Sequence, residues 1–425
     1  MTDHEGEYSI IGRPLIKVDA MAKVTGETKF ADDLALPRML HAKILRSPHP
    51  HARILSIDTG PAEALPGVHA VLTGRALPIK FGILPVSQDE EALATERVRY
   101  VGDPVAAVAA VDEETAEAAC RLIRVEYEVL PALMSVGEAL AREDVRIHDY
   151  GPRGNIHKEV ALEFGDVEEG FSQADYVRED VFCYEGNTHL PMEQHAALAS
   201  HGPDGKLCLW SSTQTPHYVH RALAKVLELP ASHIRVIALP NGGGFGGKSD
   251  PFSHEIVVCK LSMLTGRPVK ICLTREEVFY AHRGRHPVTM WFKTGVTRDG
   301  AITAMHFRSY LDGGAYGSYG VASLYYTGAL QTVTYRVPRY KFEGVRVFTN
   351  KPPCGPKRGH GTPQPRCALE VHLDKIAEAL GLDPYEIRRR HLVQPNSVTI
   401  NQLRIGTVGL GECLDRVVER SGWKE

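Results

Sequence analysis

The chain has 425 residues, more than a single hydrophobic core usually supports, so we expect two or more domains. Hydrophobic residues make up 43% and charged residues 24%, which is typical of an ordinary globular protein. The formal net charge is only -3 and no long basic run occurs, which argues against nucleic acid as a partner.

No stretch approaches the roughly 18 apolar residues that a membrane span needs, so we expect no membrane association. The acidic N-terminus lacks the charged-then-apolar pattern of a signal peptide, which favours a cytoplasmic location. The 8 cysteines are scattered and form no C-x-x-C pair, which suits neither a zinc site nor an iron–sulfur cluster. We expect most of them to be buried apolar side chains.

The first part of the chain has the pattern of an α/β unit over residues 15–133, preceded by a tail over residues 1–14. Alternation of apolar and polar residues predicts strands, and a helix is expected where alanine-rich periodicity replaces it. In chain order, the predicted elements are a strand region over 41–59, a short helix and strand in ALPGVHAVLTG, a buried strand over 105–111, a helix over 113–123 and a strand over 124–130.

A turn-rich stretch over residues 134–160 predicts a linker, and EFGDVEEGF just after it predicts a hairpin. A longer mixed region is expected over residues 161–425. Its predicted strands cover 207–215, 234–240, 269–274, 286–297, 302–314 and 340–350, and its predicted helices cover 216–227, 252–264 and 364–380. The tail over 382–423 is predicted to be helical with an interruption at PNSVTI.

The sharpest motif is the glycine-rich loop NGGGFGGKS, residues 241–249, between a predicted strand and a predicted helix. Glycines let a backbone approach a bulky group, and N–H groups ahead of a helix favour an anion. The positions Gly242, Gly247, Lys248 and Ser249 also satisfy the P-loop pattern of nucleotide triphosphatases. That alternative needs an Asp for magnesium after a second strand, and PVKICLTREE ends in Thr and Arg.

GGGFGGK is similar to the signature of the molybdenum hydroxylases, the xanthine dehydrogenase superfamily. The segments STQTPH, PCGPKRGHGTPQ and DDLALPRMLHAKILRSPHPHARI resemble other family segments in the same order, so the resemblance covers nearly the whole chain. It implies an α+β fold in which an N-terminal α/β hammerhead domain over 15–133 precedes the first part of a large mixed α/β molybdopterin-binding domain. It also implies a molybdenum-molybdopterin cofactor, in bacteria usually the cytosine dinucleotide form.

The resemblance implies that Gln214 donates a hydrogen bond to an oxo or hydroxo ligand of molybdenum, the alternative being a glutamine that caps a helix. The loop residues Gly243, Gly244, Phe245 and Gly246 would bind the cofactor, with the phenyl ring as a wall. A Phe buried in the core is the alternative for Phe245.

The second loop, with Lys357, Arg358 and Gly359, is implied to bind the cofactor as well. Arg358 would contribute its backbone amide and its charge, and an ordinary surface arginine is the alternative. No residue is expected to ligate the metal directly, and Cys354 is expected to be structural.

Three positions argue against a purine substrate. At the positions of Tyr326, His360 and Ser249, purine oxidisers of the family carry an arginine, an aromatic residue and a glutamate, respectively. The pair Tyr326 and His360, with FGILPVSQDEEAL and LYYTGAL, resembles the large subunit of 4-hydroxybenzoyl-CoA reductase, in which a Tyr and a His could supply protons to the ring. We therefore predict Gln214, Tyr326 and His360 as catalytic residues and favour reductive dehydroxylation of an aromatic acyl-CoA. Hydroxylation of an N-heterocycle or an aldehyde is the alternative.

Large subunits of the family are nearly twice this length, and their second half carries a glutamate that acts as the general base. Glu168 and Glu412 follow glycines, but their surroundings do not resemble that segment, and Glu412 is expected to open the last helix. The resemblance implies a subunit split into two chains, as in nicotinate dehydrogenase, with a truncated gene as the alternative. The expected partners are a second half-subunit with the base, a 2Fe-2S subunit and an FAD subunit, assembled as a dimer of heteromers.

Overall fold

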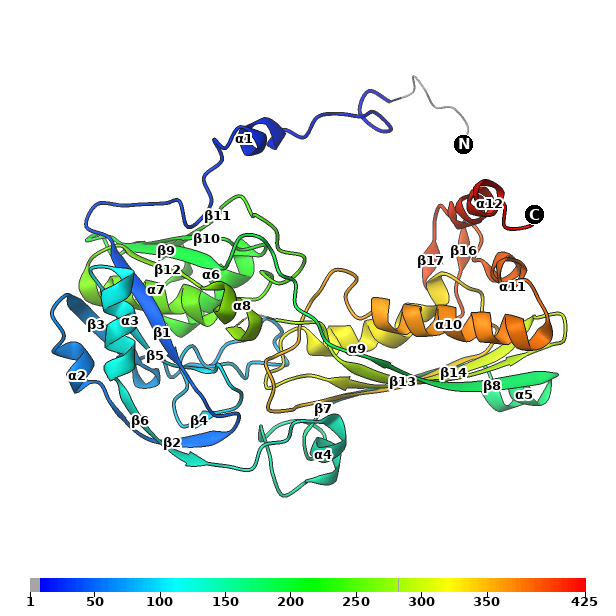
Figure 1. The fold of residues 1–425 in the computed structure, drawn as a ribbon, viewed down its shortest axis with the longest axis horizontal. Helices are drawn as coiled ribbons and strands as arrows, with labels where there is room; N and C mark the ends of the chain where they lie inside the picture. The colour runs from blue at the N-terminus through cyan, green and yellow to red at the C-terminus, as the bar shows by residue number, and fades with distance from the viewer. Residues whose placement is uncertain (1–7, 282) are drawn as a thin grey trace.

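The computed structural model describes residues 8–281 and 283–425, and its body is built on two large sheets that follow one another along the long axis (Figure 1). The segment with α1 (Ala20–Val24) projects away from this body, and α1 buries no residue (Figure 1). None of the helices in the described ranges is long and apolar enough to cross a membrane. The mixture of sheets and helices confirms the predicted α+β class.

The first large sheet has 7 strands in the order β11-β10-β9-β12-β1-β5-β3. Their bounds are β1 (Leu40–Arg46), β3 (Val68–Thr73), β5 (Pro104–Ala110), β9 (Ala196–His201), β10 (Leu207–Ser211), β11 (Ile234–Ala238) and β12 (Val269–Cys272). Strand β1 pairs in parallel with β12, so strands from both sides of residues 134–160 share one sheet. Of the strands within residues 15–133, β1, β3 and β5 therefore belong to a sheet that they share with later strands.

Helices cover this sheet because their apolar faces need a partner. The central helix is α7 (Ser253–Thr265), which packs on β9, β12 and β3 and is almost wholly apolar at its centre. The other helices around the sheet are α2 (Gly60–Glu63), α3 (Glu113–Leu122), α6 (Pro216–Val226) and α8 (Arg275–Ala281). These positions confirm the helices predicted over 113–123, 216–227 and 252–264.

The predicted strand region 41–59 is two strands that belong to different sheets. The turn after Arg46 sends the chain from β1 into β2 (Ala52–Asp58), which pairs with β4 (Arg97–Val98) and β6 (Arg124–Val129) in a 3-stranded sheet. The backbone N–H of Ser47 donates to the carbonyl of Asp103 at this turn, and a proline lies on each side of His49. Proline cannot continue a ladder, so the run of alternating residues is broken there.

The second large sheet has 5 strands in the order β7-β15-β14-β13-β8. Their bounds are β7 (Ile156–Phe164), β8 (Tyr176–Tyr184), β13 (Val288–Val296), β14 (Ile302–Asp312) and β15 (Tyr340–Val347). The helices α9 (Gly320–Ala329) and α10 (Pro363–Leu380) lie along one face (Figure 1). Three stacked or tilted phenyl rings, Phe292, Phe307 and Phe342, form the centre of its core.

The hairpin predicted around EFGDVEEGF is wrong. Strands β7 and β8 lie at opposite edges of the 5-stranded sheet, and α5 (Val167–Ser172) connects them. The side chain of Asp166 accepts a hydrogen bond from the N–H of Glu169, which caps a helix rather than closing a turn. The predicted linker 134–160 is also structured in part, because it contains α4 (Val136–Ala141) and the start of β7.

The C-terminal part continues with α11 (Pro384–His391), a ladder of β16 (Ser397–Val398) with β17 (Arg404–Ile405), and α12 (Leu410–Ser421). Glu412 lies in the first turn of α12, as predicted, and pairs with Arg416. The expectation that most cysteines are buried is wrong. Cys120, Cys259 and Cys354 are buried, Cys208 and Cys272 are half-buried, and Cys183, Cys367 and Cys413 are exposed.

Candidate functional site

The glycine-rich loop joins the end of β11 to the start of α7 and runs through backbone conformations that favour glycine. Gly243 and Gly246 have φ of 103° and 94°, and Phe245 between them has φ of 54°. A Cβ on Gly246 would lie 2.7 Å from the carbonyl oxygen of Pro356, and one on Gly244 would lie 2.5 Å from Oε1 of Gln214. Glycine is therefore required at position 246 by the backbone of another segment, whereas a Cβ on Gly244 would displace the side chain of Gln214.

The side chain of Gln214 is anchored by one end only. Its Oε1 accepts hydrogen bonds from the N–H of Gly246 at 3.0 Å, from the N–H of Lys248 at 3.3 Å and from Oγ of Ser249 at 3.4 Å. Its Nε2 donates to no described residue, and the side chain is exposed. The alternative of a helix-capping Gln is wrong, because Thr215 is the N-cap of α6 and Gln214 bonds to the loop. An amide donor is thus left open beside the loop.

Lys248 is not available to a phosphate. Its side chain is 1% exposed, and its Nζ donates to Oε2 of Glu193 at 2.6 Å. The same Glu193 oxygen accepts from the N–H of Gly242 at 2.9 Å, so the ion pair fixes both ends of the glycine-rich loop. Burial lowers the pKa of Lys248 against the opposing effect of Glu193. The P-loop alternative is wrong, because its lysine has to reach bound phosphates.

The second loop packs directly on the first. The N–H of Arg358 donates to the carbonyl of Phe245 at 2.9 Å, and the guanidinium of Arg285 donates to the carbonyl of Arg358 at 2.5 Å. The Arg358 amide that the sequence predicts for the cofactor is therefore used to hold the two loops together. Lys357 donates to the carbonyl of Thr188 at 2.9 Å and to the side chain of Asn187, so its ammonium also braces the loop.

An aromatic cluster lies beside these loops. The ring of His360 meets Tyr326 at a centroid distance of 5.7 Å and Tyr319 at 5.5 Å, both edge-on. Tyr319 hydrogen-bonds to Tyr218 of α6, and Oγ of Ser323 lies 2.6 Å from Nε2 of His360. Burial lowers the pKa of His360 to about 4, so its imidazole is neutral at pH 7.

The structure thus brings together α6, α9 and both predicted loops, and it adds residues that the sequence analysis missed. Tyr218 lies in the first turn of α6, four residues after Gln214, so its closeness along the chain was a usable signal. Tyr319 and Ser323 carried no such signal, since only the packing of α9 against the second loop places them beside His360. Phe245 is 46% exposed, so the alternative of a buried core Phe is wrong.

The donor set fits a bulky group with oxygen ligands. The site offers the open amide of Gln214, the exposed ring of Phe245 and a cradle of glycine backbone that is packed against Gln214 and Pro356. Within residues 8–281 and 283–425, no group of three or more His, Cys, Asp or Glu side chains could hold a metal ion.

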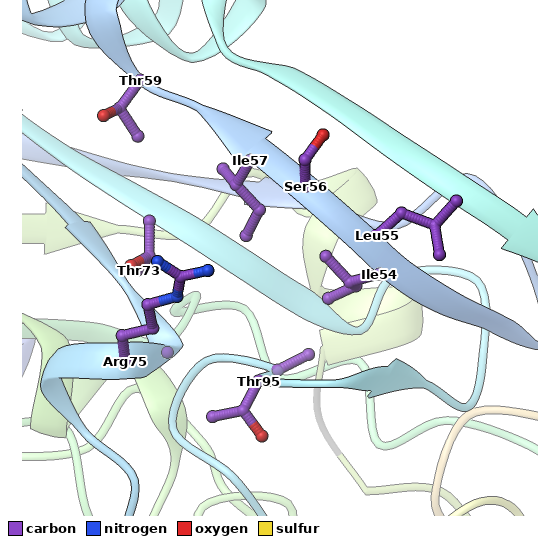
Figure 2. A pocket seen from close by; sticks show the side chains of 10 residues that line it. Ile54, Leu55, Ser56, Ile57, Thr59, Thr73, Arg75 and Thr95 are labelled. Carbon is purple, nitrogen blue, oxygen red and sulfur yellow. The ribbon is translucent and has the colours of Figure 1, made fainter.

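A separate pocket lies away from the two loops. Figure 2 shows it between β2 and the segments around Arg75 and Thr95, with a volume of about 200 Å³. None of the predicted site residues lines it. A pocket of about 490 Å³ lies nearer to the loops and is lined in part by Thr188, Arg285 and the buried Cys354.

Comparison with known proteins gives consistent matches. A molybdopterin cofactor-binding domain model matches residues 147–392, and a model of the aldehyde oxidase and xanthine dehydrogenase a/b hammerhead domain matches residues 25–131. The chain is 38% identical to the nicotinate dehydrogenase large molybdopterin subunit of Eubacterium barkeri, over 98% of this chain and 97% of that protein. It is 39% identical to a probable xanthine dehydrogenase subunit of Bacillus subtilis, over 96% of this chain and 54% of that protein.

A solved structure gives the same picture. Quinoline 2-oxidoreductase from Pseudomonas putida 86 superposes with a TM-score of 0.90 at 32% identity, over 96% of this chain and 54% of that one. The chain therefore spans about half the length of this structure and of the Bacillus subtilis relative, and nearly the whole of the Eubacterium barkeri protein.

Proposed function

Because the chain belongs to the aldehyde oxidase and xanthine dehydrogenase family, we propose that it is the molybdopterin-binding half-subunit of an enzyme that hydroxylates an electron-poor aromatic ring. The family is one of molybdenum oxidoreductases, so the chain is part of an enzyme. The observation that carries the proposal is the Gln214 amide, which the glycine-rich loop holds by its oxygen and leaves open at its nitrogen.

The residues of this chain have distinct roles in the proposal. When bound, the molybdenum-pterin group supplies an oxygen donor and a two-electron acceptor. Nε2 of Gln214 would donate a hydrogen bond to the group, and Gly244 and Gly246 would allow the backbone to lie against it. The ring of Phe245 excludes water from one side. Tyr326 and His360 form the wall on which an aromatic substrate lies.

The state of His360 supports hydroxylation over reduction. A proton donor for an electron-loaded ring works best when its pKa lies near the working pH. Burial lowers the pKa of His360 to about 4, so at pH 7 the ring is not an imidazolium and lacks the acidic proton that such a donor transfers. The reductive dehydroxylation of an aromatic acyl-CoA remains the second candidate, favoured by the pairing of Tyr326 with His360 at 5.7 Å.

Further chains complete the proposed enzyme. We propose a second molybdopterin half-subunit that carries the general-base glutamate, a 2Fe-2S subunit and an FAD subunit, in a cytoplasmic dimer of heteromers. The cofactor is proposed in its cytosine dinucleotide form. The proposal of a subunit split into two chains is supported by the match over 97% of a nicotinate dehydrogenase subunit, compared with 54% of the Bacillus subtilis relative.

The test is purification of the complex with its native partners under molybdate-replete growth. We expect stoichiometric molybdenum by elemental analysis and oxidation of nicotinate coupled to an artificial electron acceptor. Molybdenum-free complex would contradict the cofactor assignment. Reduction of 4-hydroxybenzoyl-CoA without oxidation of nicotinate, quinoline or an aldehyde would favour the second candidate.

A further inference from the structure

The loop that carries His360 is held unusually close to α9. A Cβ on Gly361 would lie 2.4 Å from the carbonyl oxygen of Ser323, and Gly361 has φ of 73°, so only glycine permits this approach. The hydroxyl of Thr327 donates to the carbonyl of Gly361 at 3.0 Å. These contacts place Nε2 of His360 2.6 Å from Oγ of Ser323.

The hydroxyl hydrogen of Ser323 has one acceptor within reach. Ser323 is 0% exposed, and the only described hydrogen bond of its Oγ is the one to His360. If Nε2 of His360 carried a proton and donated it, the buried hydroxyl hydrogen would have no acceptor, which is costly. The hydroxyl therefore donates to Nε2, which has to be the unprotonated nitrogen of the ring.

A neutral imidazole with an unprotonated Nε2 carries its proton on Nδ1. The pKa of His360, about 4, keeps the ring neutral at pH 7. Nδ1 has no hydrogen-bond partner among the described residues. It is also not among the fully buried polar atoms that lack a partner, so it is accessible to a ligand. The His360 ring lies edge-on to the rings of Tyr326 and Tyr319, so this donor belongs to an aromatic wall.

We infer that Ser323 is a positioning residue that fixes the tautomer of His360, so that Nδ1–H is a standing hydrogen-bond donor at the aromatic wall. The ligand class that this arrangement selects is a planar aromatic ring bearing a hydrogen-bond acceptor, such as a ring nitrogen or a carbonyl oxygen. A ring with no acceptor leaves the donor unpaired once water is displaced, and a site built this way discriminates strongly. The inference deepens the proposed function and rests on its assignment of the substrate wall.

The first measurement is independent of molybdenum. Nitrogen-15 spectra of the purified complex labelled at histidine report the protonated nitrogen of His360, whose signal is identified by its loss in His360→Gln. We expect the proton on Nδ1 in the wild type and in Ser323→Thr, which keeps the hydroxyl. In Ser323→Ala we expect it to move towards Nε2. A proton on Nε2 in the wild type overturns the inference.

The second measurement compares quinoline with naphthalene, which has the same shape without the ring nitrogen, by the change in ligand fluorescence on binding. We expect the wild type to bind quinoline about tenfold more tightly, the value of one retained hydrogen bond. Ser323→Ala should reduce the preference to about twofold or less. The matched control is Thr327→Val, which loosens the same loop without touching His360 and should keep the preference.

Equal binding of the two rings by the wild type, or an unchanged preference in Ser323→Ala, overturns the inference. A molybdenum-free complex that still shows the Nδ1 proton and the quinoline preference supports the inference while contradicting the proposed function. The two failures are therefore distinguishable.

Discussion

The side-chain oxygen of Gln214 lies 3.0 Å from the backbone nitrogen of Gly246, so the segment after β10 and the glycine-rich loop share a hydrogen bond at the candidate site. This bond orients the amide. Because the oxygen is used by the loop, the nitrogen is the end that points to a ligand, and no rotation of the amide can exchange the two without breaking up to three contacts.

Replacing Gln214 separates its two roles. Gln214→Glu keeps an oxygen acceptor for the loop but removes the amide donor, whereas Gln214→Ala removes both. We expect both variants to assemble and to lose about 10²–10³-fold in kcat, the usual effect of deleting one donor at a developing charge. Steady-state turnover and molybdenum content are the measurements. Full activity in Gln214→Glu would show that the donor has no role.

Gly246→Ala tests the close contact between the two loops. The substitution places a Cβ 2.7 Å from the carbonyl oxygen of Pro356. Gly266→Ala is the control, because Gly266 has φ of 61° but nothing within 4 Å of its Cβ. Each change costs about 1–2 kcal/mol for the left-handed backbone, and only Gly246→Ala also pushes the loops apart. We expect a lower molybdenum content in Gly246→Ala alone. Equal molybdenum contents would contradict the cradle.

Removing one partner of the buried Lys248–Glu193 ion pair is expected to destabilise the fold. Lys248→Met or Glu193→Gln leaves one buried partner uncompensated, which costs about 3–5 kcal/mol. The double variant should cost less than the sum of the two single changes. Urea unfolding followed by circular dichroism measures the free energies. The exposed pair of Arg416 with Glu412 is the control, and Arg416→Ala should cost less than about 1 kcal/mol.

Glu255 predicts a pH dependence of stability. It is 1% exposed, accepts from Oγ of Ser211 at 2.6 Å, and burial raises its pKa from 4.5 to about 7. Between these values the unfolded chain releases a proton that the folded chain keeps, so the free energy of unfolding falls as the pH rises from 4.5 to about 7. The loss amounts to about 3 kcal/mol.

Glu255→Gln should reduce this slope by the contribution of Glu255, because the amide does not titrate. The slope that remains comes from other buried carboxyls, such as Asp103, whose pKa burial raises to about 7. The exposed Glu276→Gln is the matched control and should leave the slope unchanged. Urea unfolding at a series of pH values checks the difference between the variants. A slope of unchanged size in Glu255→Gln would contradict the assignment to Glu255.

The pattern of apolar residues predicted the structure correctly where an element buries one apolar face. The alanine-rich helix α3 and the long helix α10 follow from their apolar faces, and the glycine-rich loop was evident from its composition alone. The predicted hairpin after β7 failed for the opposite reason. Asp166 caps helix α5 there. The residues alone do not distinguish a turn from a short helix at this point, because the difference depends on which strand β8 pairs with.

The sequence by itself indicated the α+β class, the helices α3, α6, α7 and α10, and the two loops with Gln214, because these depend on periodicity, composition and motif order along the chain. It did not predict α4, α5 or α9. Only the tertiary structure decided that Lys248 is buried against Glu193, that the amide of Arg358 is spent on Phe245, and that Ser323 meets His360. Those pairs are separated by tens of residues, and a hydrogen bond needs two groups within about 3 Å. No pattern along one strand or helix specifies such a distance, since it results from how the sheets and α9 pack.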